Sequence, residues 1–114
     1  MKITELTTKL YYHVTPTVNV QSILQHGLVP GSGKRSQVIG EQGKFIFLFG
    51  DIVSAEDAVA NWLGDEFNED ELLTLLQVSI PENFPIKHDK AVAYEFFTDK
   101  KIPAENIKVI NSNF

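Results

Sequence analysis

The sequence predicts a small α+β fold in which short, mostly antiparallel strands carry two short helices packed on them. Three observations lead to this prediction: short runs of aromatic and β-branched residues, two apolar patterns with helical spacing in the first half of the chain, and turn residues between these segments. With 114 residues, of which 43% are apolar, the chain suits one domain, 1–114, with a buried core.

The chain opens with a strand signal followed by a helix signal. Lys9–Val14 is rich in aromatic and β-branched residues and predicts a strand. We expect a short helix next, with Thr17 or Asn19 as its N-cap. Its apolar positions are Val20, Ile23 and Leu24. Gly27 is expected to end this helix in a Schellman motif, which brings Leu28 against the helix.

A glycine-rich segment separates the first helix from the next strand. Pro30–Gly43 contains four glycines and predicts a long loop, and long loops in small domains usually carry function. Phe45–Phe49 is wholly apolar and predicts a buried strand. A second helix should start after Ser54 as its N-cap and end at Gly64. Its apolar face is expected to consist of Ala55, Ala58, Val59, Trp62 and Leu63.

The second half of the chain is dominated by strand signals. Leu72–Ile80 is rich in leucine, which also suits a helix, but its apolar residues alternate before Pro81 and favour a strand. Ala91–Thr98 predicts another strand. Pro103 should open a single helical turn. Ile107–Ile110 should form the closing strand.

Composition excludes several classes of protein. The chain has no cysteine, which excludes disulfides, cysteine-based zinc sites and iron–sulfur clusters, and with three histidines we expect no metal site. No apolar run approaches the ~18 residues needed to cross a membrane. Met1–Glu5 lacks the apolar core of a secretory signal, so we expect a cytoplasmic protein without a membrane partner.

Negative charge is concentrated in one segment, residues 51–71. It holds eight acidic residues and no lysine or arginine, whereas the rest of the chain has seven acidic and ten basic residues, a net charge of +3. The eight are Asp51, Glu56, Asp57, Asp65, Glu66, Glu69, Asp70 and Glu71. Such a segment usually forms a solvated helix and loop, but it is also a candidate surface for a basic partner.

Three polar residues stand out among apolar neighbours: His13 and Glu95, each on a predicted strand, and Arg35, the only arginine, in the glycine-rich loop. Each has an ordinary structural explanation when taken singly. Burying such a group without a partner costs roughly 1–3 kcal/mol. Their occurrence together with a long loop favours a functional site.

Three segments resemble a known family in the order in which they occur. Leu10-Tyr-Tyr-His13-Val-Thr15 followed by Ile23-Leu-Gln-His-Gly27-Leu28 resembles the opening of small ADP-ribosyltransferase-fold domains. The strand at Phe45–Phe49, followed by a helix at Ala55, is similar to the Ile-Tyr-Leu strand of that family and the helix after it. Ala93-Tyr-Glu95, followed by Ile102-Pro103 and Ile107, resembles its closing segment, which carries a catalytic glutamate. The resemblance extends to bacterial DNA ADP-ribosyltransferase toxins, RNA 2′-phosphotransferases and, more loosely, poly-ADP-ribose polymerases.

The resemblance implies that NAD is a substrate and assigns roles to particular residues. His13 and Glu95 would be catalytic: His13 would bind the ribose beside the nicotinamide, and Glu95 would hold its 2′-hydroxyl and stabilise the cationic sugar. The residues implied in NAD binding are His13, Thr15, Arg35, Ser36 and Phe47. Arg35 would contact the pyrophosphate, and Phe47 would stack on the nicotinamide where many members have a tyrosine.

The implied activity is transfer of ADP-ribose to a macromolecular acceptor, nucleic acid or protein, as in a toxin, effector or phage modifier. An alternative is a non-catalytic binding module on the same scaffold that recognises a nucleotide, a nucleic acid or a protein. Phe47 favours it slightly, because phenylalanine lacks the hydroxyl of the usual tyrosine. A third alternative, an RNA 2′-phosphotransferase, is weakened because that group uses several arginines and this chain has one.

Overall fold

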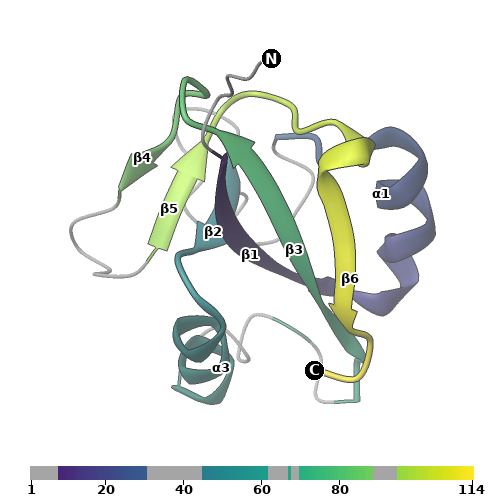
Figure 1. Ribbon diagram of the computed structural model, residues 1–114. Helices are drawn as coiled ribbons and strands as arrows, with labels where there is room; N and C mark the ends of the chain where they lie inside the picture. Colours follow the sequence, from purple (N-terminus) through teal and green to yellow (C-terminus); the bar gives the residue numbers. More distant parts are fainter. Residues whose placement is uncertain (1–7, 31–44, 62–66, 68–69, 89–94) are drawn as a thin grey trace.

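The computed structural model describes residues 8–30, 45–61, 67, 70–88 and 95–114. Its strands form one antiparallel six-stranded sheet in the order β4-β5-β2-β1-β3-β6 (Figure 1). The strands are β1 (Thr8–Pro16), β2 (Ile46–Phe49), β3 (Leu73–Pro81), β4 (Lys87–His88), β5 (Glu95–Thr98) and β6 (Ile107–Asn111). The helices are α1 (Val20–His26) and α3 (Ile52–Asn61). The predicted α+β class, with antiparallel strands and two short helices, is therefore confirmed.

The long central strand β1 organises the sheet. It pairs with β3 along its whole length, from Thr8 opposite Pro81 to Pro16 opposite Leu73. The prediction ended this strand at Val14, which was two residues too early. Pro16 is tolerated because it is the last residue of the strand, where the missing N–H breaks no internal ladder.

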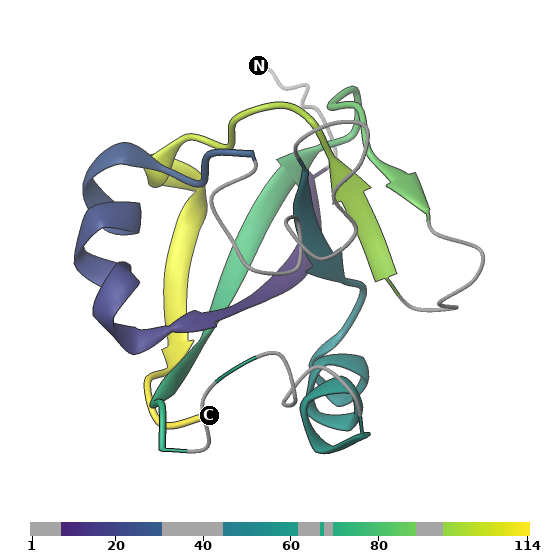
Figure 2. The ribbon, with the colours of Figure 1, turned by 180° about the vertical axis from the view of Figure 1, so that it is seen from behind.

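Two apolar clusters cover the two faces of the sheet. Alternation along β1 divides them: Tyr11 belongs to the first cluster, whereas Tyr12 packs against the second and Val14 belongs to it. The first cluster also contains Leu28, Ile46, Leu48, Leu76, Val78, Ile80, Ile102 and Ile107. The second contains Phe49, Ala55, Ala58 and Leu75. Figures 1 and 2 both show α1 beside β6 and α3 near the ends of β1 and β2.

The start of α1 differs from the prediction. A 3-10 turn, η1 (Thr17–Asn19), precedes the helix, and no side chain caps either element. The Thr17 hydroxyl is instead 2.8 Å from the hydroxyl of Thr74 on β3, so it ties the turn to the sheet. Of the apolar positions, Ile23 packs against the first cluster while Leu24 is 44% exposed.

Gly27 ends α1 as predicted, but not in a Schellman motif. Its N–H donates to the Ile23 carbonyl at 2.7 Å, and its backbone has φ 84° and ψ −178°, an extended left-handed conformation that only glycine adopts readily. Leu28 is a member of the first cluster, against which Ile23 of α1 also packs. Leu28 then forms an isolated antiparallel bridge with Ile102, with N–O distances of 2.9 and 3.0 Å.

Helix α3 begins three residues before the predicted position. Asp51, rather than Ser54, caps it: the Asp51 carboxylate accepts the Ser54 N–H at 2.7 Å, and this hydrogen bond lowers the pKa of Asp51. Carboxylates favour this position because they complement the positive end of the helix dipole. Ala55 and Ala58 are buried as predicted. Trp62, Leu63 and Gly64 lie outside the described residues.

The second half of the chain follows the prediction more closely. The leucine-rich segment forms strand β3, and β6 closes the sheet. Pro103 precedes a 3-10 turn, η3 (Ala104–Asn106). β5 starts at Glu95. The earlier part of its predicted range lies outside the described residues, and so does the predicted loop from residue 31 onward. The sequence did not predict β4, which has only two residues.

Candidate functional site

His13 is held by the backbone of the neighbouring strand. It lies on β1 opposite Leu76, on the sheet face of the first cluster. Its Nδ1 is 2.7 Å from the carbonyl oxygen of Phe47 on β2. A carbonyl oxygen only accepts hydrogen bonds, so Nδ1 carries the proton and donates it. This bond fixes both the orientation of the imidazole and its tautomer.

The second ring nitrogen of His13 is an acceptor without a hydrogen-bond partner among the described residues. Burial lowers the pKa of His13 below 6.5, and the hydrogen bond to Phe47 offsets this only in part. The imidazole is therefore neutral at pH 7. Because Nδ1 holds the proton, Nε2 presents a lone pair, and no hydrogen-bond partner for it occurs in the part of the chain that the structure describes.

Thr15 adds a second polar group on the same face of β1. It lies two residues after His13, which places the two backbones roughly 7 Å apart along the strand. Its side chain is 4% exposed, and its hydroxyl has no hydrogen-bond partner among the described residues. A buried hydroxyl without a partner costs about 1–3 kcal/mol, so a ligand that bonds to it would recover this free energy.

Phe47 meets His13 through its backbone. Its ring packs against Phe45 and Phe97, with ring centres 6.2 and 6.0 Å apart, and is 7% exposed. Its neighbours Leu48 and Phe49 lie in the first and second cluster, so alternation puts the Phe47 ring on the face opposite His13. The expected stacking of this ring on a nicotinamide beside His13 therefore has no support in the described geometry.

Glu95 is described through its backbone, and its side chain lies outside the description. It is the first residue of β5 and pairs with Phe49, which pairs in turn with Tyr12. One strand, β2, separates β5 from β1, so their backbones are roughly 10 Å apart. Glu95 thus lies two strands away from His13, in register with Tyr12, the residue before His13 on β1.

Two residues expected to bind NAD are not described, and the expectations about metals and membranes concern the described residues only. Arg35 and Ser36 lie outside the described residues. Among the residues that are described, no three histidine or carboxylate side chains gather in the way that a metal ion needs. In the same residues, no helix has the length and apolar character needed to cross a membrane.

The structure also brings together residues that the sequence analysis missed. Tyr11, two residues before His13 on the same face of β1, lines a pocket with His88 and Phe96. The spacing of Tyr11 from His13 was a usable signal, because residues two apart on a strand share a face. No sequence pattern indicated that His88 on the two-residue strand β4 would line this pocket.

The state of His13 predicts a specific dependence of stability on pH. Because the folded state lowers its pKa, the unfolded chain binds a proton more readily, and the free energy of unfolding should fall as the pH drops below about 6.5. Above pH 7.5 this contribution should be constant. The control is His13→Asn, whose amide can still donate to the Phe47 carbonyl but does not titrate. Urea unfolding at several pH values should show a steeper decline for the wild type than for His13→Asn, and parallel curves would contradict the assignment.

The chain matches no family model, no curated protein and no solved structure.

Proposed function

We propose that the protein is an NAD-dependent ADP-ribosyltransferase whose acceptor is a macromolecule. The observation that carries this proposal is the pair of polar groups without partners on one face of β1, Nε2 of His13 and the hydroxyl of Thr15. Both suit the hydroxyl-rich ribose of a dinucleotide. The sequence resemblance supports NAD in particular, because both residues belong to the motif that carries it.

His13 has the chemistry that ribose binding needs. A neutral imidazole with its proton on Nδ1 accepts a hydrogen bond at Nε2, and a ribose hydroxyl is a suitable donor. The Phe47 carbonyl keeps the ring in this state before NAD arrives. Preorganisation of this kind lowers the entropy lost on binding. The role of Phe47 in the proposal is therefore to position His13.

The proposed reaction breaks one bond and forms another. Nicotinamide leaves NAD with the electron pair of the glycosidic bond, and positive charge develops on the ribose. A nucleophile of the acceptor then bonds to the same carbon and gives its proton to solvent. Glu95 would stabilise the developing cation, and a preorganised electrostatic contact of this kind contributes about 10²–10³-fold to the rate.

Catalysis by this pair places a requirement on β5. The register puts Glu95 in the row of Tyr12, one residue from the row of His13. The proposed mechanism therefore requires the Glu95 carboxylate to act on a ligand held at His13, one residue row and two strands away. Arg35 and Ser36, which precede β2 in the sequence, would complete the site at the pyrophosphate.

Labelled NAD tests the proposal directly. The protein is incubated with NAD labelled in its ADP-ribose part and, separately, with single-stranded DNA, RNA, RNA bearing a 2′-phosphate, and a protein extract. We expect free nicotinamide together with label in one of these macromolecules. Removal of the 2′-phosphate would identify the RNA phosphotransferase reaction instead. Absence of both label transfer and nicotinamide release with all four would contradict the proposal.

A binding module for a basic partner is the second candidate, and one observation favours it. Glu56 and Asp57 on α3 and Asp70 beyond it are exposed, and none of them has an ion pair within the described part of the chain. Unpaired carboxylates of one sign attract a basic surface. This candidate needs no NAD turnover, so it would gain if NAD neither bound nor reacted.

A further inference from the structure

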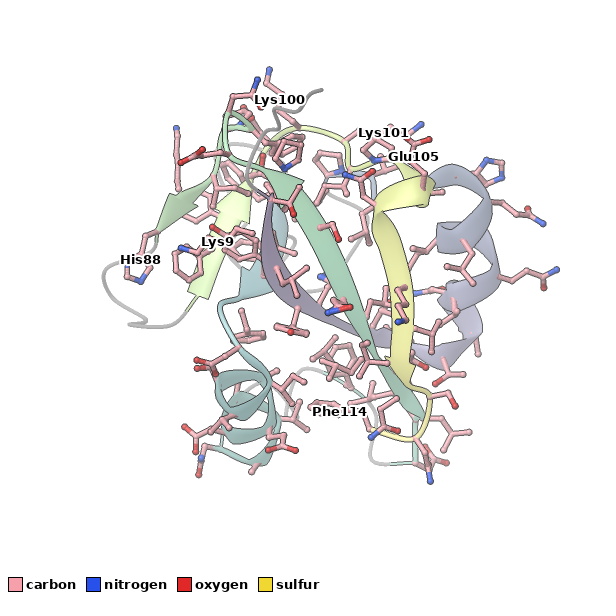
Figure 3. The ribbon with its side chains drawn as sticks, viewed as in Figure 1. Lys9, His88, Lys100, Lys101, Glu105 and Phe114 are labelled. Atoms are coloured by element: carbon pink, nitrogen blue, oxygen red, sulfur yellow. The ribbon has the colours of Figure 1, made fainter. Side chains whose placement is uncertain are left out.

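A pocket of about 420 Å³ opens on the first-cluster face of the sheet, beyond Tyr11 toward the start of β1. Side chains from five segments line it: β1, β3, β4, β5 and the segment between β3 and β4. Those that matter here are Lys9, Tyr11, Glu82, Phe84, His88 and Phe96. Figure 3 shows Lys9 and His88 close to β4 and β5, on the same side of the molecule.

Aromatic rings form much of the wall and hold one another in place. The rings of His88 and Phe96 stack with centres 4.6 Å apart and an interplanar angle of 19°. Tyr11 meets Phe96 edge to face, with ring centres 5.2 Å apart. The buried Thr98 hydroxyl donates to the Pro85 carbonyl at 2.8 Å and so fixes the segment before β4 against β5. The aromatic wall is therefore formed before any ligand arrives.

Two polar groups of the pocket have no charged or hydrogen-bonded partner among the described residues. Tyr11 is 6% exposed, yet its hydroxyl has no hydrogen bond there. Burial raises the pKa of Tyr11, so the hydroxyl keeps its proton and remains a donor. The Lys9 ammonium lies 5.8 Å from the centre of the Tyr11 ring, and it pairs with no carboxylate of the described ranges. A hydroxyl in the pocket wall and a nearby cation can thus both serve one ligand.

We infer that this pocket binds the base of a nucleotide, with the Tyr11 hydroxyl on a ring-edge acceptor and Lys9 on the phosphate. A nucleotide matches the groups that line the pocket. Its planar base suits the aromatic walls, acceptors on the base edge suit the Tyr11 hydroxyl, and its phosphate suits Lys9. The volume lies in the lower part of the roughly 300–1,000 Å³ range of ligand pockets, which suits a single nucleotide. The inference is independent of NAD turnover.

Uridine monophosphate is the probe of choice, because NAD contains no uracil. Titration of the isotopically labelled protein, followed by NMR, should give saturable shifts at Tyr11, His88 and Phe96. Tyr11→Phe keeps the ring and removes only the hydroxyl, and should weaken binding about fivefold. Lys9→Met should weaken binding and reduce its dependence on salt. Lys100→Met, an exposed lysine that does not line the pocket, is the matched control and should bind as the wild type does.

The same titration distinguishes a nucleotide within a strand, a free nucleotide and a pocket that does not recognise the base. Tighter binding of a short oligouridylate than of the mononucleotide would place the nucleotide within a strand, and equal binding would indicate a free nucleotide. Shifts reproduced in full by inorganic phosphate would show that the base is not recognised and would overturn the inference. Absence of saturable shifts, or equal affinity of Tyr11→Phe and the wild type, would overturn it as well.

Discussion

Replacing Gly27 with alanine should lower the free energy of unfolding by about 3 kcal/mol or more. The backbone of Gly27 has φ 84° and ψ −178°, a region that costs a residue with a side chain about 1–3 kcal/mol. A Cβ at this position would also collide with the carbonyl oxygen of Ile102. That oxygen accepts the Leu28 N–H in the bridge, so it cannot withdraw without breaking a hydrogen bond. Backbone strain and the collision with the Ile102 carbonyl therefore both lower the free energy of unfolding.

Gly50→Ala is the matched control. Gly50 has no positive φ, and an added Cβ would meet only the edge of the Phe96 ring at 3.1 Å. A side chain can shift where a backbone carbonyl cannot, so the loss should be about 1 kcal/mol. Thermal unfolding should lower the melting temperature by roughly 10 °C or more for Gly27→Ala and by much less for Gly50→Ala. Equal melting temperatures for the two variants would contradict the left-handed turn after α1.

Replacing Glu95 with glutamine should abolish ADP-ribose transfer, a loss of at least about 10²–10³-fold in rate, while the fold and NAD binding persist. Glutamine has nearly the same shape but carries no charge to stabilise the cationic ribose. Nicotinamide release, followed by chromatography, is the direct measurement. The effect should fall on turnover far more than on the apparent affinity for NAD, because the carboxylate acts mainly in the transition state.

Glu105→Gln controls for the loss of one negative charge. Glu105 is exposed on η3, at the α1 side of the sheet, and should leave turnover unchanged. The melting temperature of Glu95→Gln should match the wild type, which separates a chemical effect from unfolding. Retained turnover in Glu95→Gln would remove Glu95 from the proposed mechanism.

Periodicity predicted the elements of this fold better than their ends. The sequence predicts both the alternation in β3 and the small apolar face of α3, because each pattern reflects which side of the element is buried. The ends depend on tertiary partners instead. β1 runs on through Pro16 because β3 continues beside it, and Thr17 bonds to Thr74 rather than capping α1. Asp51 replaces Ser54 as the cap because α3 begins earlier.

The candidate site was only partly accessible from sequence for a related reason. Residue types single out His13 and Thr15, but the partner that fixes the tautomer of His13 is a backbone carbonyl, and any residue could supply it. The same alternation that puts Tyr11 on the face of His13 turns the Phe47 ring to the other face. Side-chain identity suggested a stacking role for Phe47, whereas the register gives it a positioning role.

Binding of NAD to the purified protein, measured by calorimetry, tests the central claim most directly. The wild type should bind NAD. His13→Asn, which can keep the hydrogen bond to Phe47 but lacks Nε2, should bind much more weakly, as should His13→Ala. Because burial lowers the pKa of His13 in the folded protein, binding by the wild type should change little near pH 6.5 and weaken only at lower pH, where protonation removes the Nε2 acceptor. No detectable binding at millimolar NAD, or equal binding by all three proteins, would contradict a dinucleotide site at His13.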